Sequence, residues 1–154
     1  MYHTILVPLD GSKRAEAILP HVEELAQRND VKVILLQVTE PEPIIINYDL
    51  VYTSPDLESY ERRLKQDAEN YLAVQRERFH KKGINAEIQV GQGPVVATII
   101  NAAEEVSADL VAMASHGRTG LARVFYGSVA AGVLHRVDRP LLLIRSSDNG
   151  SSEL

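Results

Sequence analysis

The stretch Ile5-Leu6-Val7-Pro8-Leu9-Asp10-Gly11-Ser12 places a short apolar run directly before turn-forming residues. A short run that is rich in branched side chains and bounded by turn formers predicts a buried strand. Apolar residues then recur at helical spacing from Ala15 to Ala26, with Ser12 as a candidate N-cap and Pro20 as a candidate bend. The chain therefore opens with a strand, a tight turn and a helix.

The same alternation continues along the whole chain. Further strands are expected at the apolar runs 31–38, 84–90, 109–114 and 141–144. Further helices are expected at 57–82, 95–106 and 127–137. Strands that alternate with helices predict a parallel sheet with right-handed crossovers, and continuous apolar strands predict helices on both faces. Ligands of such sheets bind beyond the carboxyl ends of the strands, where the winding reverses.

The composition bounds the class of protein. The 154 residues, 45% apolar and with a net charge of −5, suit one domain, which we expect over 1–146, followed by a flexible polar tail at 147–154. The acidic balance and the mixed charges of the 57–82 helix give no basic face for a nucleic acid. No apolar run approaches the roughly 18 residues of a membrane span, and no secretory signal opens the chain. We expect a cytoplasmic protein with neither a nucleic-acid nor a membrane partner.

The segment Ala114-Ser115-His116-Gly117-Arg118-Thr119-Gly120-Leu121-Ala122-Arg123-Val124-Phe125-Tyr126-Gly127-Ser128 leaves the fourth expected strand and enters the fourth helix. Its glycines allow the backbone to approach a ligand closely, and the free N–H groups at the helix start favour an anion. Arg118 and His116 add charge-assisted contacts. The segment predicts either a phosphate cradle or a glycine-rich turn that only reverses the chain.

In this segment the chain resembles the universal stress protein family. Nucleotide-binding members carry a loop written G-x2-G-x9-G-[ST], and here Gly117 is followed by nine residues and then Gly127-Ser128. Ala114 stands where the first glycine of the motif falls. The runs 8–12, 35–38 and 139–144 resemble the family as well, so that the likeness covers nearly the whole chain.

The resemblance implies a doubly wound α/β fold, Rossmann-like and of the adenine nucleotide alpha hydrolase type. Its open five-stranded parallel sheet has the order 3-2-1-4-5, and ATP lies across the ends of strands one and four. The sequence does not distinguish ATP from cyclic AMP or another adenylate in this site. The implied nucleotide-binding residues are Pro8, Leu9 and Asp10 beside the adenosine, Val38 at the adenine through its backbone, Met113 and Ala114 on the floor, and Ser115, His116, Gly117, Arg118, Thr119, Gly120, Gly127, Ser128 and Val129 along the phosphate loop. Asp10 faces the ribose or a nucleotide-bound Mg²⁺.

Ala114 has two possible consequences. If the family glycine needs a positive φ, alanine costs about 1 kcal/mol of local strain. If the glycine only makes room, one methyl group must be accommodated. Either cost amounts to about a tenfold loss of affinity rather than to a loss of binding.

The remaining motifs favour binding over catalysis. Gly91-Gln92-Gly93-Pro94-Val95-Val96 is a turn that opens a helix rather than a dinucleotide fingerprint, and no G-x4-G-K-[ST] loop is present. No carboxylate can be assigned to orient His116, so we expect no catalytic residues. Three functions remain open: an ATP-binding regulatory module, a slow ATPase or phosphotransfer enzyme, and a nucleotide-free interaction protein.

The last expected strand, Leu141-Leu142-Leu143-Ile144, is fully apolar and falls at the edge of the sheet in the implied order. A bare apolar edge invites pairing with another chain. Antiparallel pairing with its own copy would give a two-fold homodimer, which the family resemblance also implies.

Overall fold

The structure is a computed structural model that describes residues 1–28, 30–40, 55–116 and 127–146, without the side chains of 55, 56 and 116. The expectations for the phosphate loop at 117–126 and for the tail at 147–154 therefore lie outside the described residues.

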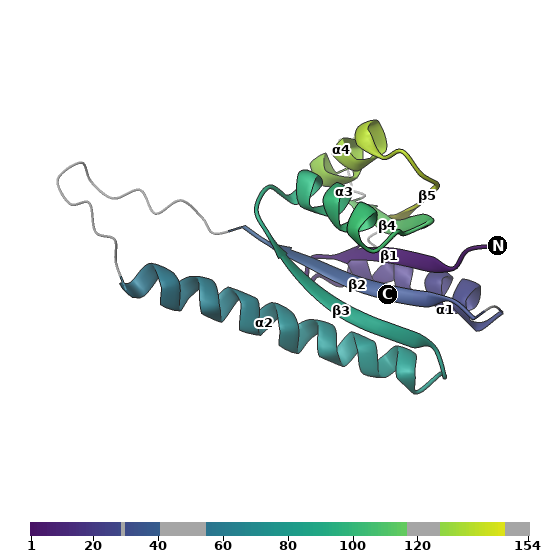
Figure 1. Cartoon of the computed structure of the whole chain (residues 1–154), viewed down its shortest axis with the longest axis horizontal. Coiled ribbons are helices and arrows are strands. Elements are labelled where there is room, and N and C mark those ends of the chain that lie inside the picture. The colour runs from purple at the N-terminus through teal and green to yellow at the C-terminus, as the bar shows by residue number, and fades with distance from the viewer. Residues whose placement is uncertain (29, 41–54, 117–126, 147–154) are drawn as a thin grey trace, which may run out of the picture.

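Five parallel strands form one sheet of order β3-β2-β1-β4-β5, which confirms the predicted topology (Figure 1). The strands are β1 (Thr4–Leu9), β2 (Lys32–Thr39), β3 (Asn85–Gln92), β4 (Leu110–His116) and β5 (Leu141–Ser146). The helices are a single 3-10 turn η1 (Ala15–Ile18), α1 (Leu19–Gln27), α2 (Pro55–His80), α3 (Val95–Glu105) and α4 (Ser128–Arg136). Every predicted element is present, with ends that differ by a few residues.

Two hydrophobic clusters lie on opposite faces of the sheet. Ile5, Val7 and Leu9 of β1 pack toward η1, α1 and α2, whereas Leu6 between them packs toward α3 and α4. This alternation follows from the two-residue period of a strand, and it places helices on both faces as predicted (Figure 1).

The first helix differs in detail from the prediction. It begins as the 3-10 turn η1, where Ser12 Oγ accepts the Ala15 N–H at 3.2 Å, and it becomes α-helical at Leu19. Pro20 lies in the first turn of α1, where a missing N–H leaves no helical hydrogen bond unmade. The expected bend is thus a change of helix type just before the proline.

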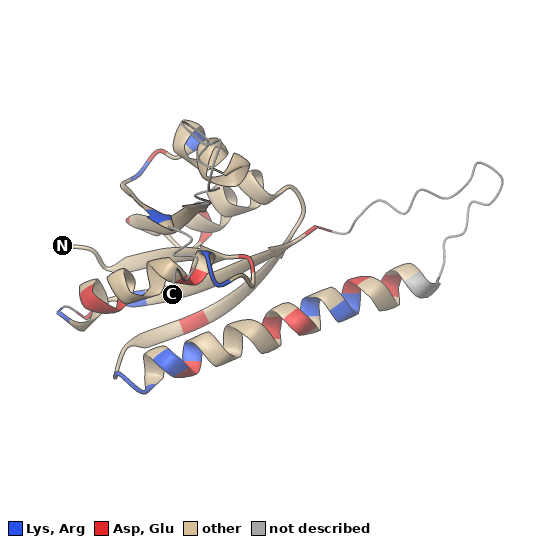
Figure 2. Cartoon of the chain, turned by 180° about the vertical axis from the view of Figure 1, so that it is seen from behind, with Lys and Arg blue, Asp and Glu red and all other residues tan. Residues whose placement is uncertain are grey.

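Charged residues of both signs alternate along α2, as Figure 2 shows. The Lys65 ammonium lies 3.9 Å from the Glu69 carboxylate, an i,i+4 pair on the exposed surface. This arrangement fits the solvated face that the sequence predicts. Among the described residues, no helix is long and apolar enough to cross a membrane.

The end of α3 is closed by a residue in a left-handed conformation. Ser107 has φ of 51°, and its N–H donates to the Glu104 carbonyl while the Ala108 N–H donates to the Ala103 carbonyl. These two bonds form a Schellman motif, in which glycine is the preferred residue at the Ser107 position. Arg139 adds hydrogen bonds from Nη1 to the carbonyls of Ala103 and Ala108, both at 2.9 Å.

Ser107→Gly is expected to stabilise the fold by about 1 kcal/mol, because glycine adopts this φ without the Cβ conflict. The expected rise in the midpoint of thermal unfolding is roughly 2–4 °C, measured by circular dichroism. Ser107→Ala keeps the Cβ and serves as the control. An equal gain in both variants would contradict the conformational explanation.

Asp109 ties the start of β4 to the start of β1. Its carboxylate accepts the His3 N–H at 2.8 Å, the Thr4 N–H at 3.0 Å and lies 3.1 Å from His3 Nδ1. Burial raises the pKa of Asp109, but the hydrogen bonds from His3 and Thr4 outweigh it and hold the pKa below its ordinary value of 3.8. The Asp109 carboxylate is therefore charged at neutral pH and keeps its hydrogen bonds to His3 and Thr4.

Asp109→Asn is expected to lower the unfolding midpoint at pH 7, with a deficit that narrows in acid. A carboxyl whose pKa is lowered by folding stabilises the protein above its unfolded value, and this contribution disappears as the pH falls through the lower folded value. Unfolding curves of both proteins at pH 7 and at about pH 3 measure the difference. A deficit that is the same at both values would show that the charge is irrelevant.

Candidate functional site

The site is a crevice between the carboxyl ends of β1 and β4. These neighbouring strands pair only at Ile5↔Leu110 and Leu6↔Val111, although both continue further. Pro8 follows within β1, and proline has no N–H to donate to a ladder. The strands therefore separate at the point where the winding of the sheet reverses, which is where ligands bind in such folds.

The crevice encloses a cavity of about 150 Å³. Its lining includes seven of the residues that the family resemblance implies: Pro8, Leu9, Asp10, Val38, Met113, Ala114 and Val129. The volume is smaller than the roughly 300–1,000 Å³ of a typical ligand pocket. The described residues thus enclose room for one part of a larger ligand, such as a base, and the remainder would extend beyond the strand ends.

Five lining residues were not expected from the sequence: Ala15, Leu36, Val95, Ile99 and Ala130. Val95 and Ile99 come from the first two turns of α3, and Ala130 comes from the first turn of α4. The signal that could have identified the α3 residues is the Gly91–Pro94 turn, since it places the start of α3 at the carboxyl edge of the sheet.

The backbone of Val38 contributes a polar group to this largely apolar cavity. The pairing of β2 with β1 ends at Leu9↔Gln37, so Val38 lies past the last β1 partner. The next carbonyl, that of Thr39, accepts the Gly93 N–H on the β3 side at 3.3 Å. Because successive carbonyls along a strand point to opposite edges, the Val38 carbonyl points toward the crevice side of β2.

Asp10 lines the cavity and also organises the turn after β1. Its Oδ1 accepts the Ser12 N–H at 2.9 Å and the Ser12 hydroxyl hydrogen. Among the described residues, no group of three or more His, Asp and Glu side chains could hold a metal ion. Asp10 supplies the one carboxylate among the described residues that line the cavity, and an Mg²⁺ bound there would need oxygens from the ligand as well.

Ala114 lies within β4 opposite Ile144, and its φ is not positive. Of the two consequences considered for this alanine, backbone strain therefore does not apply, and only the space taken by its methyl group remains. Ser115 is buried, and its hydroxyl donates to the Ile144 carbonyl at 3.2 Å, so it ties β4 to β5. His116 ends β4. Gly117, Arg118, Thr119 and Gly120 lie outside the described residues.

Gly127 and Ser128 stand at the start of α4, as predicted. Gly127 has φ of −46° and ψ of 150°, a conformation open to any residue, and its carbonyl accepts the Ala131 N–H at 3.0 Å. The first N–H groups of a helix have no partner within it and attract anions. Because Val129 and Ala130 of this turn line the crevice, an anion at the helix start would sit beside the cavity.

Tyr71 of α2 approaches the turn after β1 from the other face of the sheet. Burial raises the pKa of its phenol well above the usual range, and the carboxylates of Glu16 and Asp10 raise it further. The hydroxyl therefore stays neutral, and it supplies no base to the Asp10 turn at physiological pH.

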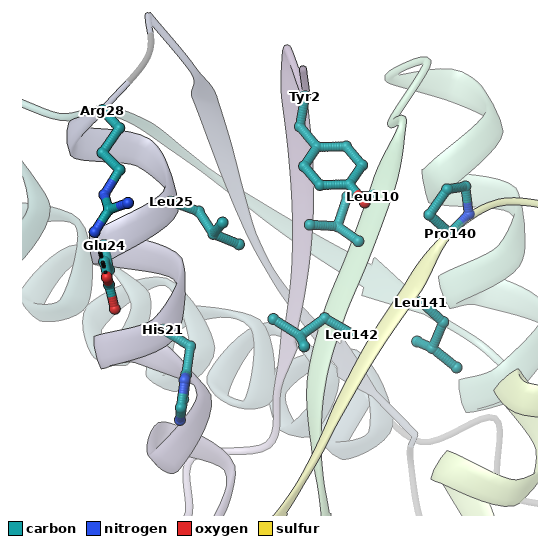
Figure 3. Close-up of a pocket in the computed structure, with 9 residues that line it drawn as sticks. All are labelled: Tyr2, His21, Glu24, Leu25, Arg28, Leu110, Pro140, Leu141 and Leu142. Carbon is teal, nitrogen blue, oxygen red and sulfur yellow. Dashed lines mark hydrogen bonds and ion pairs between the residues drawn. The ribbon is translucent and has the colours of Figure 1, made fainter.

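A second hollow, of about 410 Å³, lies at the other end of the strands, where β4 and β5 begin (Figure 3). Tyr2, Leu25, Leu110 and Leu142 line its apolar floor, between α1 and the edge strand β5. At its rim the Arg28 guanidinium donates to the Glu24 carboxylate at 2.7 Å. The hollow sits at the amino ends of β4 and β5, away from the edge where parallel sheets bind ligands.

Comparison with known proteins agrees with this geometry. The model of the universal stress protein family matches residues 1–145. The universal stress protein MJ0577 of Methanocaldococcus jannaschii is 26% identical over 97% of this chain and 98% of its own. The solved structure of the hypothetical protein MJ0577 superposes with a TM-score of 0.76, 28% identity and coverage of 96% of this chain and 99% of that one.

Two more distant structures share the fold and carry adenine nucleotides. A universal stress protein in complex with cAMP has a TM-score of 0.69 at 22% identity, covering 95% of this chain and 98% of its own. A family protein of Arabidopsis thaliana with AMP bound has a TM-score of 0.67 at 19% identity, covering 98% and 97%. Because the family model matches nearly its whole length, the chain belongs to the universal stress protein family.

Proposed function

We propose that this chain is an adenine-nucleotide-binding regulatory module that holds ATP in the crevice between β1 and β4. The observation that carries the proposal is the separation of these two strands after Leu6↔Val111, which opens an apolar cavity beside the start of α4. Two solved structures of the same fold, one in complex with cAMP and one with AMP bound, support an adenine nucleotide as the ligand.

The adenine ring suits the apolar part of the crevice. Val95 and Ile99 of α3 form one wall, and Val129 and Ala130 of α4 form the other. A ring buried between such walls would gain from the loss of apolar surface to water. The Val38 carbonyl is an acceptor for the exocyclic amino group of adenine, whereas guanine presents a carbonyl oxygen at the corresponding position.

The phosphates would lie past the strand ends, at the amino terminus of α4. The free N–H groups of its first turn and the helix dipole stabilise negative charge there. The expected loop residues from Gly117 to Gly120 stay predictions, as does the part of Asp10 as a ligand to the ribose or to nucleotide-bound Mg²⁺.

Isothermal titration with Mg-ATP tests this function directly. We expect binding at micromolar or tighter concentration, and GTP should bind at least tenfold more weakly because its base does not complement the Val38 carbonyl. ADP released over hours by the same sample distinguishes a slow ATPase from a pure binder. No heat with ATP, ADP, AMP or cAMP at millimolar concentration would leave a nucleotide-free interaction protein as the remaining reading.

We further propose that β5 is the interface of a homodimer. Leu141, Leu142, Leu143 and Ile144 are each only half-buried, and within the part of the chain that the structure describes β5 pairs with β4 alone. An edge strand of this kind can pair antiparallel with its copy about a two-fold axis. The hollow lined by Leu142 and Leu110 adjoins this edge and adds apolar surface for the partner to cover.

Leu142→Glu is expected to convert the dimer into a monomer, because two carboxylates would face each other across the two-fold axis in place of apolar contact. Sedimentation velocity measures the change. Val74→Glu, at an exposed position of α2, which packs over β2 and β3 away from β5, is the control that should leave the dimer intact. A dimer that survives Leu142→Glu would place the interface elsewhere.

A further inference from the structure

The walls of the crevice are held by a close contact between α3 and α4. A Cβ atom built on Gly132 of α4 would lie 2.7 Å from Val96 Cγ2 and 3.3 Å from Val96 Cγ1 of α3. Ordinary contact begins at 3.4 Å, so even the smallest side chain at position 132 is too large for the present spacing. The two helices approach each other this closely because glycine carries only a hydrogen atom at position 132.

This contact lies one helical turn from the cavity. Gly132 is three residues past Val129, so the two positions share one face of α4, and Val96 follows Val95 on α3. Val95 and Val129 both line the cavity, one from α3 and the other from α4. The distance between the helices at Gly132 and Val96 therefore sets the separation of the walls.

The other side of α3 is also in close contact. A Cβ on Gly91 of β3 would lie 2.5 Å from Thr98 Cγ2. The Thr98 hydroxyl donates to the Pro94 carbonyl at 2.7 Å, which fixes the orientation of this side chain. Since α3 is seated against β3 in this way, a larger side chain at position 132 would displace α4 and its Val129 wall rather than α3.

We propose that Gly132 is a positioning residue for the nucleotide site, one that fixes the width of the crevice so that it fits a flat purine ring. Packed interiors do not adjust continuously to an added methyl group, and the strain is transmitted to neighbouring positions. The proposal rests on the proposed function in naming adenine as the ring that the walls clasp. It assigns to Gly132 an effect on affinity although the residue itself lies outside the cavity lining.

The test is a cycle of three variants: Gly132→Ala, Val96→Ala and the double substitution. Gly132→Ala is expected to weaken Mg-ATP binding about tenfold, because a wall displaced by a fraction of an ångström no longer contacts the ring. The double variant is expected to bind within about threefold of wild type, because Val96→Ala removes both methyl groups that the new Cβ would meet.

The unfolding midpoint separates positioning from simple stability. Alanine at 132 raises helix propensity while it crowds Val96, so the midpoint alone does not report on the crevice. Unchanged affinity in Gly132→Ala would overturn the proposal, and so would equally weak binding in the single and the double variant. If wild type binds no adenine nucleotide, the proposed function fails, but the effect of Gly132 on the crevice can still be tested. A crystal structure of Gly132→Ala measures the separation of Val95 and Val129, and a separation equal to that of wild type would overturn the proposed spacing role.

Discussion

Ala114→Leu is expected to weaken the binding of adenine nucleotides by about a hundredfold, a loss of about 2.7 kcal/mol. The methyl group of Ala114 already lies on the lining of a cavity of only about 150 Å³, and leucine adds three carbon atoms to it. The site is only partly buried, so the larger side chain can be accommodated in the fold while it occupies the ligand's space. Isothermal titration with Mg-ATP measures the loss, and circular dichroism checks that the variant is folded.

Ala114→Gly is the matched control, and its expected effect has the opposite sign. Because φ at this position is not positive, glycine removes no strain and acts only by giving room. Binding should therefore be unchanged or up to about tenfold tighter. Equal affinity of Ala114→Leu and wild type would show that the nucleotide does not enter between β1 and β4.

The double substitution Arg78→Met with Lys82→Met is expected to cost about 3 kcal/mol of unfolding free energy. Glu23 of α1 pairs with Arg78 of α2 and with Lys82 just beyond it, and its side chain is only 7% exposed. Removing both cations would leave a carboxylate buried without compensation. The cations themselves are 37% and 42% exposed, which places the expected loss at the lower end of the range for buried pairs. Urea unfolding measures it.

Two further variants test the cause. Adding Glu23→Leu to the double substitution should recover most of the stability, because an apolar contact replaces the unpaired charge. Glu24→Gln removes the neighbouring exposed pair with Arg28 and should cost less than about 0.5 kcal/mol. A loss below about 1 kcal/mol in the Arg78/Lys82 variant would mean that water reaches the Glu23 carboxylate.

The sequence predicts the architecture well because the fold depends on patterns that are local. Each strand is a short run bounded by turn formers, as at Ile5–Leu9, and the alternation with helices determines the parallel topology. Gly83 is a local signal of the same kind, since a glycine directly after the expected 57–82 helix is typical of a helix end, and its φ is +73°. The left-handed Ser107 was missed, because serine carries no signal for that conformation.

The site was predicted only in part, and mainly through the family motif. Asp10, Val38 and Ala114 meet at the crevice because all three lie at or just past the carboxyl ends of neighbouring parallel strands. Val95 and Ile99 were missed because apolar residues at helical spacing look the same whether they face a core or a cavity. The direction of the Ser115 hydroxyl, toward Ile144, was also beyond the sequence, since it depends on the register of β4 with β5.

The two-pair ladder between β1 and β4 has a consequence for how such a site persists through evolution. The cavity opens because the main chains of β1 and β4 separate after two paired residues. Most side chains around it can therefore be replaced as long as the two strands still separate there. Selection would act most strongly on the few positions that keep β1 and β4 apart, and the other lining positions would be free to change.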